Sequence, residues 1–311
     1  MKQDLLSVKD LRAAEIEALF GLAADLKDQQ RKGIAHPLLR GKCLAMIFEK
    51  PSLRTRVTFE VGMAQLGGLA LYLAPGDIRL GERETVKDVA KNLERWVDGI
   101  VARTFSHQTV EELARHAAVP VINGLSDLTH PCQVLADLFT LREKYNKLDG
   151  LKVAYIGDGN NVCHSWLYGA GKTGIEFVAA CPRGYEPHPD ILAFARRESE
   201  ACGGSLTIMH DPRQAAEGAD VLYTDVWTSM GQEAESAQRR RDFQKFQIDA
   251  SLVRLAKPDA LVMHCLPAHR GEEITDEVLD GPHSIVYEQV ENRLHLQKAI
   301  LVSLLGGREE R

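Results

Sequence analysis

The chain has 311 residues, of which 44% are hydrophobic and 26% are charged, a composition typical of a globular protein of about two domains. Its formal net charge is −6 and it has no basic tail, which argues against a nucleic acid or an anionic membrane as a partner. No apolar run approaches the roughly 20 residues of a membrane span. The first residues, Met1 to Asp4, are not followed by a signal-peptide core, so we expect a cytoplasmic protein.

The six cysteines, at positions 43, 132, 163, 181, 202 and 265, include no Cys-x-x-Cys pair and show no regular spacing. They indicate neither a disulfide framework nor a zinc knuckle. We therefore expect reduced thiols, no metal and no cofactor.

Strand-like and helix-like patterns alternate from residue 42 to about residue 290, which predicts parallel sheets with crossover helices. The strands are expected at about 43–48, 69–73, 99–103, 119–123, 152–156, 175–180, 206–209, 221–224 and 261–265. The helices are expected at about 54–66, 85–97, 109–117, 132–145, 189–202, 212–217 and 292–305, with a further one between 156 and 175.

This alternation predicts an α/β chain with two doubly wound parallel-sheet domains. The turn-prone stretch 146–150 marks their boundary, so we assign 1–146 to the first domain and 150–288 to the second. The last helix follows the second sheet and is expected to return to the first domain, to which we assign 292–311 as well. The polar stretch between Trp227 and Ile248 is long for a loop, and such loops are usually functional or mobile.

The most informative motif is Ser52-Leu53-Arg54-Thr55-Arg56, which lies where an apolar strand pattern gives way to a helix pattern. Ser52 suits the N-cap of that helix. Free backbone N–H groups and the positive end of the helix dipole would then meet two arginines and two hydroxyl groups. The pattern favours a phosphate site, and the alternative is an ordinary capped helix with exposed arginines.

Other polar residues stand at predicted strand ends, where open α/β sheets bind their ligands. Arg103 ends one apolar strand, and by itself it is as compatible with solvent exposure as with function. His130 precedes Pro131 at a probable helix start, a position that disfavours a protonated imidazole, and Gln133 lies in the same turn. A capping or packing histidine is the alternative.

Three further strand ends lie in the second half of the chain. The first carries Gly157-Asp158-Gly159-Asn160-Asn161-Val162, which matches a dinucleotide fingerprint only partly because Val162 replaces its third glycine. Turn chemistry is the alternative explanation of the two glycines. The second carries Asp225, a lone carboxylate that suits an ammonium group. The third carries His264 and Cys265, for which half of a zinc site and a cysteine nucleophile are alternatives.

Four motifs taken together resemble those of the ornithine carbamoyltransferases in order and approximate spacing, over nearly the whole chain. They are Ser52-x-Arg54-Thr55-Arg56, His130-Pro131-Cys132-Gln133, Asp225-Val226-Trp227-x-Ser229-Met230-Gly231 and His264-Cys265-Leu266-Pro267. The first two are shared with aspartate carbamoyltransferases and indicate carbamoyl phosphate, whereas the last two indicate ornithine. The resemblance implies transfer of a carbamoyl group from carbamoyl phosphate to the δ-amine of L-ornithine by a homotrimer or a multiple of trimers.

The resemblance also implies the site residues. Carbamoyl phosphate would be bound by Ser52, Leu53, Arg54, Thr55, Arg79, Arg103, His130, Pro131, Cys132, Gln133, Cys265, Leu266 and Arg293. Ornithine would be held by Asn161, Asp225, Ser229 and Met230. Within these sets Arg54, Thr55, Arg103, His130 and Cys265 would be catalytic, and closure of the 228–247 segment over ornithine would follow the binding of carbamoyl phosphate.

One segment departs from the family pattern. Many members have Asp-Ile-Gln-Leu-Gly-Arg-Gly-Glu where this chain has Asp77-Ile78-Arg79-Leu80-Gly81-Glu82-Arg83-Glu84. The glutamine of that pattern reaches the carbamoyl phosphate of a neighbouring subunit, and Arg79 or Arg83 is expected to supply this contact here.

Three other functions stay open at this point. A transferase acting on putrescine or an acylated ornithine is one, although putrescine would leave Asp225 and Asn161 without a group to hold. A nicotinamide-dependent dehydrogenase is the second, and a metabolite-binding protein on a transferase scaffold is the third. The sequence does not decide whether the reaction serves the synthesis or the breakdown of arginine.

Overall fold

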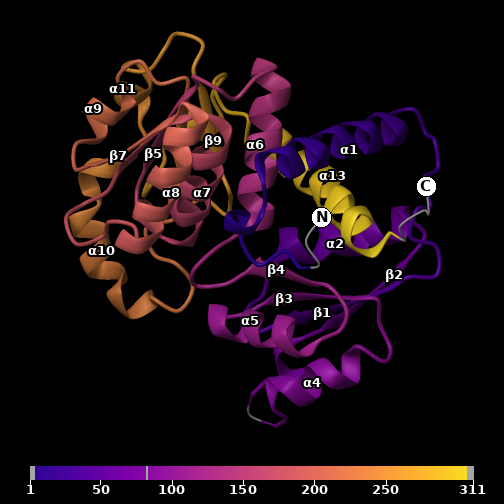
Figure 1. Cartoon of the computed structure of the whole chain (residues 1–311). Helices are drawn as coiled ribbons and strands as arrows, with labels where there is room; N and C mark the ends of the chain where they lie inside the picture. The colour runs from indigo at the N-terminus through magenta and orange to yellow at the C-terminus, as the bar shows by residue number, and fades with distance from the viewer. Residues whose placement is uncertain (1–3, 82, 307–311) are drawn as a thin grey trace. The chain divides into compact units, whose positions relative to one another are not determined.

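The computed structural model describes residues 4–81 and 83–306 (Figure 1). The chain divides into two compact units, one of Met1–Phe139 with Glu291–Arg311 and one of Thr140–Val290. Each unit has its own parallel sheet, as predicted for two doubly wound domains. No helix within the described ranges is both long and apolar enough to span a membrane.

The first unit contains a four-stranded parallel sheet with the order β2-β1-β3-β4. Its strands are β1 (Cys43–Phe48), β2 (Leu69–Leu73), β3 (Gly99–Arg103) and β4 (Val121–Leu125). Its helices are η1 (Val8–Asp10), α1 (Ala13–Arg31), α2 (Leu53–Gln65), α3 (Pro75–Ile78), α4 (Val86–Leu93) and α5 (His107–His116), with the start of α6 (Pro131–Tyr145) and most of α13 (Val286–Leu305). Figure 1 shows α4 and α5 on one face of this sheet and α2 and α13 on the other.

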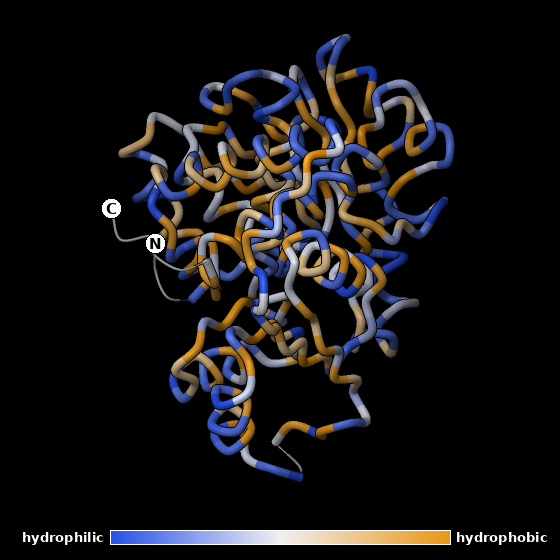
Figure 2. Tube along the Cα trace, turned by 90° about the vertical axis from the view of Figure 1, so that its right-hand side faces the viewer, coloured by the Kyte–Doolittle hydropathy of each residue, from blue (hydrophilic) through white to orange (hydrophobic). Residues whose placement is uncertain are grey.

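The core of the first unit follows from the alternation of side chains along its strands. Ala45 and Ile47 of β1, with Ile100 and Ala102 of β3, face the apolar stripes of α4 and α5. Their neighbours in sequence are also buried, so both faces of the sheet are covered. Each large aliphatic side chain buried in this way contributes about 1.5–3 kcal/mol to stability. Figure 2 shows the resulting alternation of hydrophobic and hydrophilic stretches along the chain.

The C-terminal helix α13 packs in the first unit, as predicted. A Cβ placed on Gly62 of α2 would lie 3.3 Å from Cγ of Lys298, so the two helices approach closely at this glycine. At Gly99, the first residue of β3, a Cβ would lie 3.2 Å from both δ-carbons of Leu305. Glycine at these two positions therefore permits α13 to lie directly on α2 and on the edge of β3.

The second unit contains a five-stranded parallel sheet with the order β7-β6-β5-β8-β9. Its strands are β5 (Lys152–Ile156), β6 (Glu176–Ala180), β7 (Ser205–Met209), β8 (Val221–Thr224) and β9 (Leu261–His264). Its helices are α7 (Asn161–Thr173), α8 (Pro189–Cys202), α9 (Pro212–Ala216), η2 (Glu233–Glu235), α10 (Ser236–Asp242), η3 (Gln244–Phe246), α11 (Ala250–Val253) and α12 (Asp276–Leu279). Figure 1 shows α7 and α8 together on one side of this sheet.

Each sheet has a point at which the order of its strands reverses direction. In the first unit this switch point lies between β1 and β3, and in the second between β5 and β8. Loops that leave neighbouring strands in opposite directions open a crevice there, which is where doubly wound sheets bind ligands. The motifs around Ser52, Arg103, Asn161 and Asp225 all follow these four strands.

Three local predictions were incomplete or wrong. Helix α1 was not predicted, although Ile16, Leu19, Ala23 and Leu26 recur at helical spacing and are buried. Helix α13 begins at Val286, six residues before the predicted start. The polar stretch after Trp227 is not one long loop, because it contains η2, α10 and η3. Its end is anchored by Phe243, whose ring is fully buried in the core of the second unit.

Gly159 explains one of the two glycines of the partial dinucleotide motif without any ligand. A Cβ there would lie 2.5 Å from the carbonyl carbon of Glu186 and 2.6 Å from the carbonyl oxygen of Tyr185. Its own N–H donates to that oxygen across 2.8 Å. The close approach of two backbone segments therefore requires glycine.

We expect Gly159→Ala to lower the free energy of unfolding by about 1–3 kcal/mol, because the backbone must move to admit the methyl group. Gly21→Ala is the matched control, since Gly21 lies inside α1 with open space around it. That substitution should raise stability by about 0.5–1 kcal/mol through helix propensity. Urea unfolding followed by circular dichroism measures both, and an unchanged midpoint for Gly159→Ala would contradict the close packing.

Candidate active site

The N-terminus of α2 is built as an anion-binding helix end. Ser52 is its N-cap, with extended backbone and an Oγ that accepts from the Thr55 N–H across 3.3 Å. The first turn contains no acidic residue, so the positive end of the helix dipole is not offset there. The first N–H groups of an α-helix have no acceptor further along the helix, which is why helix N-termini bind anions. The capping function of Ser52 is therefore present and is compatible with an anion at the same helix end.

The two arginines of this motif have different surroundings. Arg56 is exposed, donates from Nε to Glu60 across 3.1 Å and stacks over the ring of Tyr72, 3.7 Å from its centroid. Arg54 is half-buried, and its charge acts on His130. Of the two arginines, Arg54 is therefore the one directed toward the other predicted site residues.

Arg103 is the last residue of β3 and His130 follows β4, and both are nearly buried, with 5% and 6% of their surface exposed. Burial lowers the pKa of His130 well below its usual value, and the charges of Arg293, Arg103 and Arg54 lower it further. The imidazole is therefore neutral at pH 7 and keeps one N–H for donation. The three arginines are thus close enough to His130 for their charges to lower its pKa.

Arg293 of α13 joins three helices of the first unit. Its guanidinium is 2% exposed and donates to Gln133 Oε1 of α6 across 2.5 Å and to Thr55 Oγ1 of α2 across 3.2 Å. Its Nε donates to Gln297 across 3.2 Å within its own helix. Arg293 therefore contacts Thr55 and Gln133, which lie 238 and 160 positions before it in the sequence.

The remaining first-unit candidates are placed differently. Pro131 and Cys132 form the first turn of α6, where Cys132 is fully buried and its thiol lies 3.5 Å from the Asn123 carbonyl oxygen. Burial raises the pKa of this thiol to about 12, so Cys132 is not an activated nucleophile. The side chain of Leu53 is 73% exposed. Its contribution to an anion site is therefore its N–H.

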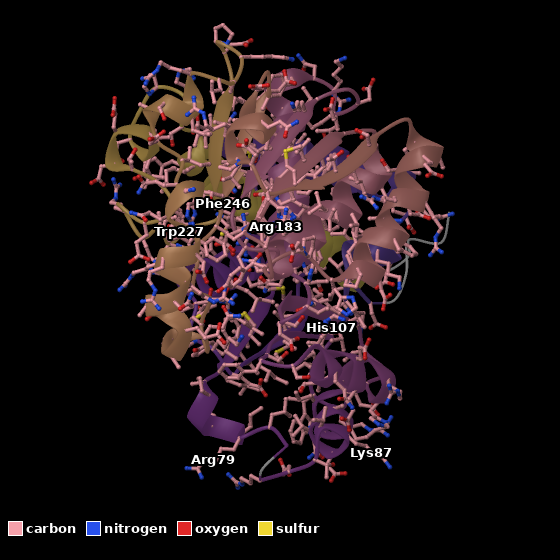
Figure 3. All side chains as sticks on the ribbon, turned by 90° about the vertical axis from the view of Figure 1, so that its left-hand side faces the viewer. Arg79, Lys87, His107, Arg183, Trp227 and Phe246 are labelled. Atoms are coloured by element: carbon pink, nitrogen blue, oxygen red, sulfur yellow. The ribbon has the colours of Figure 1, made fainter. Side chains whose placement is uncertain are left out.

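Arg79 is not brought to this group. It follows α3 in a left-handed conformation, with φ of 44°, and is exposed. Figure 3 shows its side chain directed away from the ribbon. Arg83 is exposed as well, and Glu82 between them lies outside the described residues. The contact of either arginine with carbamoyl phosphate stays a prediction.

The second unit gathers its predicted residues around Asp225. This carboxylate follows β8, is 6% exposed, and accepts at Oδ1 from the Val226 N–H and from the thiol of Cys265, each across 2.8 Å. Its Oδ2 accepts from Asn160 Nδ2 across 2.8 Å. Asp225 thus joins the ends of β5, β8 and β9.

Asn160 belongs to the adjacent asparagine pair of the sequence motif, of which the resemblance assigned only Asn161 to the site. Its Oδ1 caps α7 by accepting from the N–H groups of Val162 and Cys163, across 2.9 and 3.2 Å. Asn161, the first residue of that helix, is half-buried beside it. An asparagine directly before a helix pattern is an N-cap signal that could have identified Asn160.

His264 is held by hydrogen bonds on both ring nitrogens. Nδ1 accepts from the Leu266 N–H across 2.8 Å, so the ring proton lies on Nε2, which donates to Glu273 across 3.0 Å. One potential ligand atom each from Asp225, His264 and Cys265 lie within 4.8 Å of one another. A metal ion could bind His264 only if the hydrogen bond at Nδ1 or the one at Nε2 were broken. The geometry therefore favours hydrogen bonding over metal binding at His264.

The run Arg239-Arg240-Arg241, followed at once by Asp242, has the sequence pattern of a solvated face, but this prediction is wrong for Arg239. It is 6% exposed and donates from one terminal nitrogen to Asp158 Oδ2 and to the Trp227 carbonyl, each across 2.9 Å. Burial raises the pKa of Asp158 to about 6 against the opposing effect of the Arg239 charge. Arg239 therefore ties α10 to the ends of β5 and β8.

The segment that Arg239 supports carries the last two ornithine candidates. Ser229 is half-buried, and its N–H donates to Gln232 Oε1 across 3.2 Å. Met230 is 44% exposed. Both residues lie just after Trp227, whose ring stacks on Phe243 with centroids 5.9 Å apart. The segment is therefore fixed at its start and leaves Met230 open to solvent or to a ligand.

Fold and site together define a two-unit α/β protein with arginines gathered near His130 in one unit and a buried carboxylate at the switch point of the other. Residues 3–143 match the family model described as the carbamoyl-P binding domain of aspartate/ornithine carbamoyltransferase. Residues 149–304 match the model of its Asp/Orn binding domain. The chain belongs to the aspartate/ornithine carbamoyltransferase family.

Individual relatives are similar over the whole chain. The ornithine carbamoyltransferase of Carboxydothermus hydrogenoformans is 56% identical over 304 residues, which cover 98% of each chain. The enzyme of Pyrococcus furiosus named "Ornithine carbamoyltransferase, anabolic" is 53% identical, with 98% of this chain and 97% of that one covered. A solved structure of the ornithine carbamoyltransferase from Pyrococcus furiosus superposes with a TM-score of 0.96 at 53% identity, covering 98% of both chains.

The pKa of His130 generates a test that needs no substrate. Because the folded state holds this pKa below the ordinary value of 6.5, the unfolded chain takes up a proton that the folded chain refuses. The neutral His130 therefore supports the folded state fully above pH 6.5. The free energy of unfolding decreases as the pH falls below that value. When the pH is lowered from about 7.5 to about 5.5, the free energy of unfolding should decrease by roughly 1 kcal/mol more in the parent than in His130→Asn. Equal losses in urea unfolding of the two proteins would show that His130 titrates normally.

Proposed function

We propose that this chain transfers the carbamoyl group of carbamoyl phosphate to the δ-amino group of L-ornithine, giving L-citrulline and phosphate. The observation that carries the proposal is the placement of Arg103, Arg293 and a neutral His130 around the N-terminus of α2. That arrangement suits a dianionic phosphate beside a carbonyl oxygen. The names of relatives that are 52% to 56% identical over the full chain support the same reaction.

In this proposal the first unit supplies the carbamoyl phosphate site. The N-terminal turn of α2 and the guanidinium groups bind the phosphate, because helix N–H groups and arginines donate to oxyanions in several directions. The proposed ligands in this unit are Ser52, Leu53, Arg54, Thr55, Arg103, His130, Pro131, Cys132, Gln133 and Arg293. The contacts of Arg293 with Thr55 and Gln133 support their grouping.

The second unit supplies the ornithine site. Asp225 suits the α-ammonium group because it is a carboxylate with 6% exposure whose Oδ2 accepts from the neutral amide of Asn160. Asn161, Ser229 and Met230 are proposed to hold the carboxylate end. Cys265, hydrogen-bonded to Asp225, would orient the attacking amine, and Leu266 follows it.

The proposed chemistry is a single acyl transfer. The neutral δ-amine attacks the carbamoyl carbon, a C–N bond forms, the bond from that carbon to the phosphate oxygen breaks, and the amine proton passes to the departing phosphate. Thr55, Arg103 and His130 would donate to the carbonyl oxygen as it gains negative charge, an effect typically worth ~3–4 kcal/mol per donor. The δ-amine resembles that of lysine, with a pKa of ~10.4, so binding must select its neutral form.

Citrulline formation by the purified protein tests this function. We expect turnover with ornithine and carbamoyl phosphate, and much slower carbamoylation of putrescine, which lacks the groups that Asp225 and Asn161 would hold. Arg54→Ala should lower turnover by about 10²–10³-fold, because a charged donor to the reacting group is lost. Arg56→Ala is the matched control on the same helix, since Arg56 is engaged by Glu60 and Tyr72. Putrescine outpacing ornithine, or a fully active Arg54→Ala, would overturn the assignment.

We further propose that the chain works as a homotrimer or a multiple of trimers, as the family resemblance implies. An apolar stripe on the outer face of α2 supports this: Leu53, Val57 and Val61 are 73%, 43% and 37% exposed and lie four residues apart. Exposed apolar stripes of this kind usually mark interaction surfaces. Arg79 would then be free to reach a neighbouring subunit's carbamoyl phosphate.

The double substitution Val57→Glu with Val61→Glu tests the stripe. Charges in the middle of an apolar interface are costly, so the variant should have the mass of a monomer in light scattering while the parent is a trimer or larger. Trp96→Glu, at another exposed apolar residue, is the control and should keep the parent's mass. A double variant with unchanged mass would exclude this surface from the interface.

Cytoplasmic location and a part in arginine synthesis complete the proposal. The word "anabolic" in the name of the Pyrococcus furiosus relative supports the second of these.

A further inference from the structure

The N-terminal segment of the described chain adds to the edge of the first sheet. The Leu5 N–H donates to the Val121 carbonyl across 2.9 Å, and the Asn123 N–H donates back to the Leu5 carbonyl across 2.8 Å. Asp4 Oδ1 accepts from the Val121 N–H across 3.0 Å. Leu5 is fully buried. Residues 4–6 are therefore a built part of the sheet beside β4.

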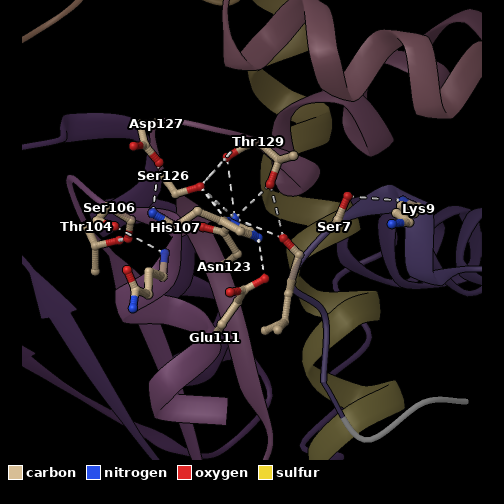
Figure 4. Close-up of polar contacts among 12 residues, drawn as sticks. Ser7, Lys9, Thr104, Ser106, His107, Glu111, Asn123, Ser126, Asp127 and Thr129 are labelled. Atoms are coloured by element: carbon tan, nitrogen blue, oxygen red, sulfur yellow. Dashed lines mark hydrogen bonds and ion pairs between the residues drawn. The ribbon is translucent and has the colours of Figure 1, made fainter. Parts of the chain in front are cut away.

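Asn123 and Thr129 connect this segment to the turn that carries His130 (Figure 4). Asn123 Nδ2 donates to the Leu6 carbonyl across 2.9 Å and to Thr129 Oγ1 across 3.0 Å. Thr129 Oγ1 donates in turn to the same Leu6 carbonyl across 3.2 Å. The three groups form a closed triangle, in which Asn123 and Thr129 have 0% and 1% of their surface exposed.

The turn itself is fixed from a second side. The Ser126 N–H donates to the Thr129 carbonyl across 3.0 Å, and Ser126 Oγ accepts from the Thr129 N–H across 3.3 Å. Ser126 Oγ also lies 2.8 Å from Nδ1 of His107, the first residue of α5. Thr129 is thus held at its N–H, its carbonyl and its hydroxyl. The next residue is His130, so its backbone has little freedom left.

We propose that Asn123 and Thr129 are positioning residues of the carbamoyl phosphate site, which fix His130 by tying its turn to the Leu6 carbonyl. The inference rests on the proposed function. Removing the Thr129 hydroxyl takes one hydrogen-bond partner from the buried Leu6 carbonyl and one from the Asn123 amide. We expect the turn to move so that these groups find other partners. A shift of about 1 Å in a side chain that donates to the reacting group can lower the rate by as much as 10²-fold.

The experiment compares Thr129→Val, Thr129→Ser and the parent, with citrulline formation measured at varied carbamoyl phosphate and varied pH. Thr129→Val, of the same shape without the hydroxyl, should lower kcat/KM for carbamoyl phosphate by about 10- to 100-fold. Thr129→Ser, which keeps the hydroxyl, should stay within about threefold of the parent. The acid limb of the kcat/KM profile should move to higher pH in Thr129→Val, because a displaced His130 regains part of its ordinary pKa.

Ser7→Ala is the matched stability control, because the Ser7 hydroxyl caps η1 in the same N-terminal segment by accepting from the Lys9 N–H. It should lower stability as a lost cap does while leaving kcat/KM and its pH profile unchanged. Should Thr129→Val not fold, Thr129→Ala is measured instead with the same expectation.

The outcomes separate the two proposals. A parent protein that forms no citrulline overturns the proposed function. An active parent whose Thr129→Val or Thr129→Ala variant keeps the parent's kcat/KM and acid limb overturns the positioning role. So does a Thr129→Ser variant that is as impaired as Thr129→Val, because the hydroxyl would then not be the group that matters.

Discussion

The first unit depends on one electrostatic constraint, the accumulation of positive charge around the N-terminus of α2. Arg293 is nearly buried and donates to the neutral side chains of Thr55 and Gln133. Arg103 is also nearly buried, and both guanidinium groups act on His130. Like charges in a low-dielectric place repel one another, and a bound dianion removes that repulsion. The folded unit is therefore already arranged for an anionic ligand.

The parallel sheets explain why such a site can be assembled from distant parts of the sequence. All strand ends that matter in a unit lie at one edge of its sheet, so the loops after β1, β3 and β4 meet although about 80 residues separate the first from the last. The second unit repeats this arrangement with Asp225, whose carboxylate collects donors from the ends of β5 and β9. The same sheet topology thus gathers positively charged side chains in the first unit and holds a buried carboxylate in the second.

Much of the fold could be predicted from the sequence, because the apolar strand patterns and the motifs after them are local signals. Ser52 as a cap and the strand that ends at Arg103 are of this kind. Partnerships between distant residues were not predictable: Arg239 looks solvated within its arginine run, and only the fold places Asp158, 81 residues away, against it. Asn123 was missed for the same reason, since its side-chain partner Leu6 lies 117 residues earlier.

The division of labour between arginine and histidine follows from their acid–base chemistry. Arginine keeps its proton at every pH at which the fold exists, so the positive field at this helix end does not titrate. The same field and burial keep His130 neutral, which lets it donate a hydrogen bond without adding a fourth full charge next to Arg54, Arg103 and Arg293. A neutral donor is also easier to hold in a buried turn, because it carries no net charge to desolvate. The hydrogen bonds that tie Thr129, the residue before His130, to the Leu6 carbonyl and to Asn123 are accordingly all made by neutral groups.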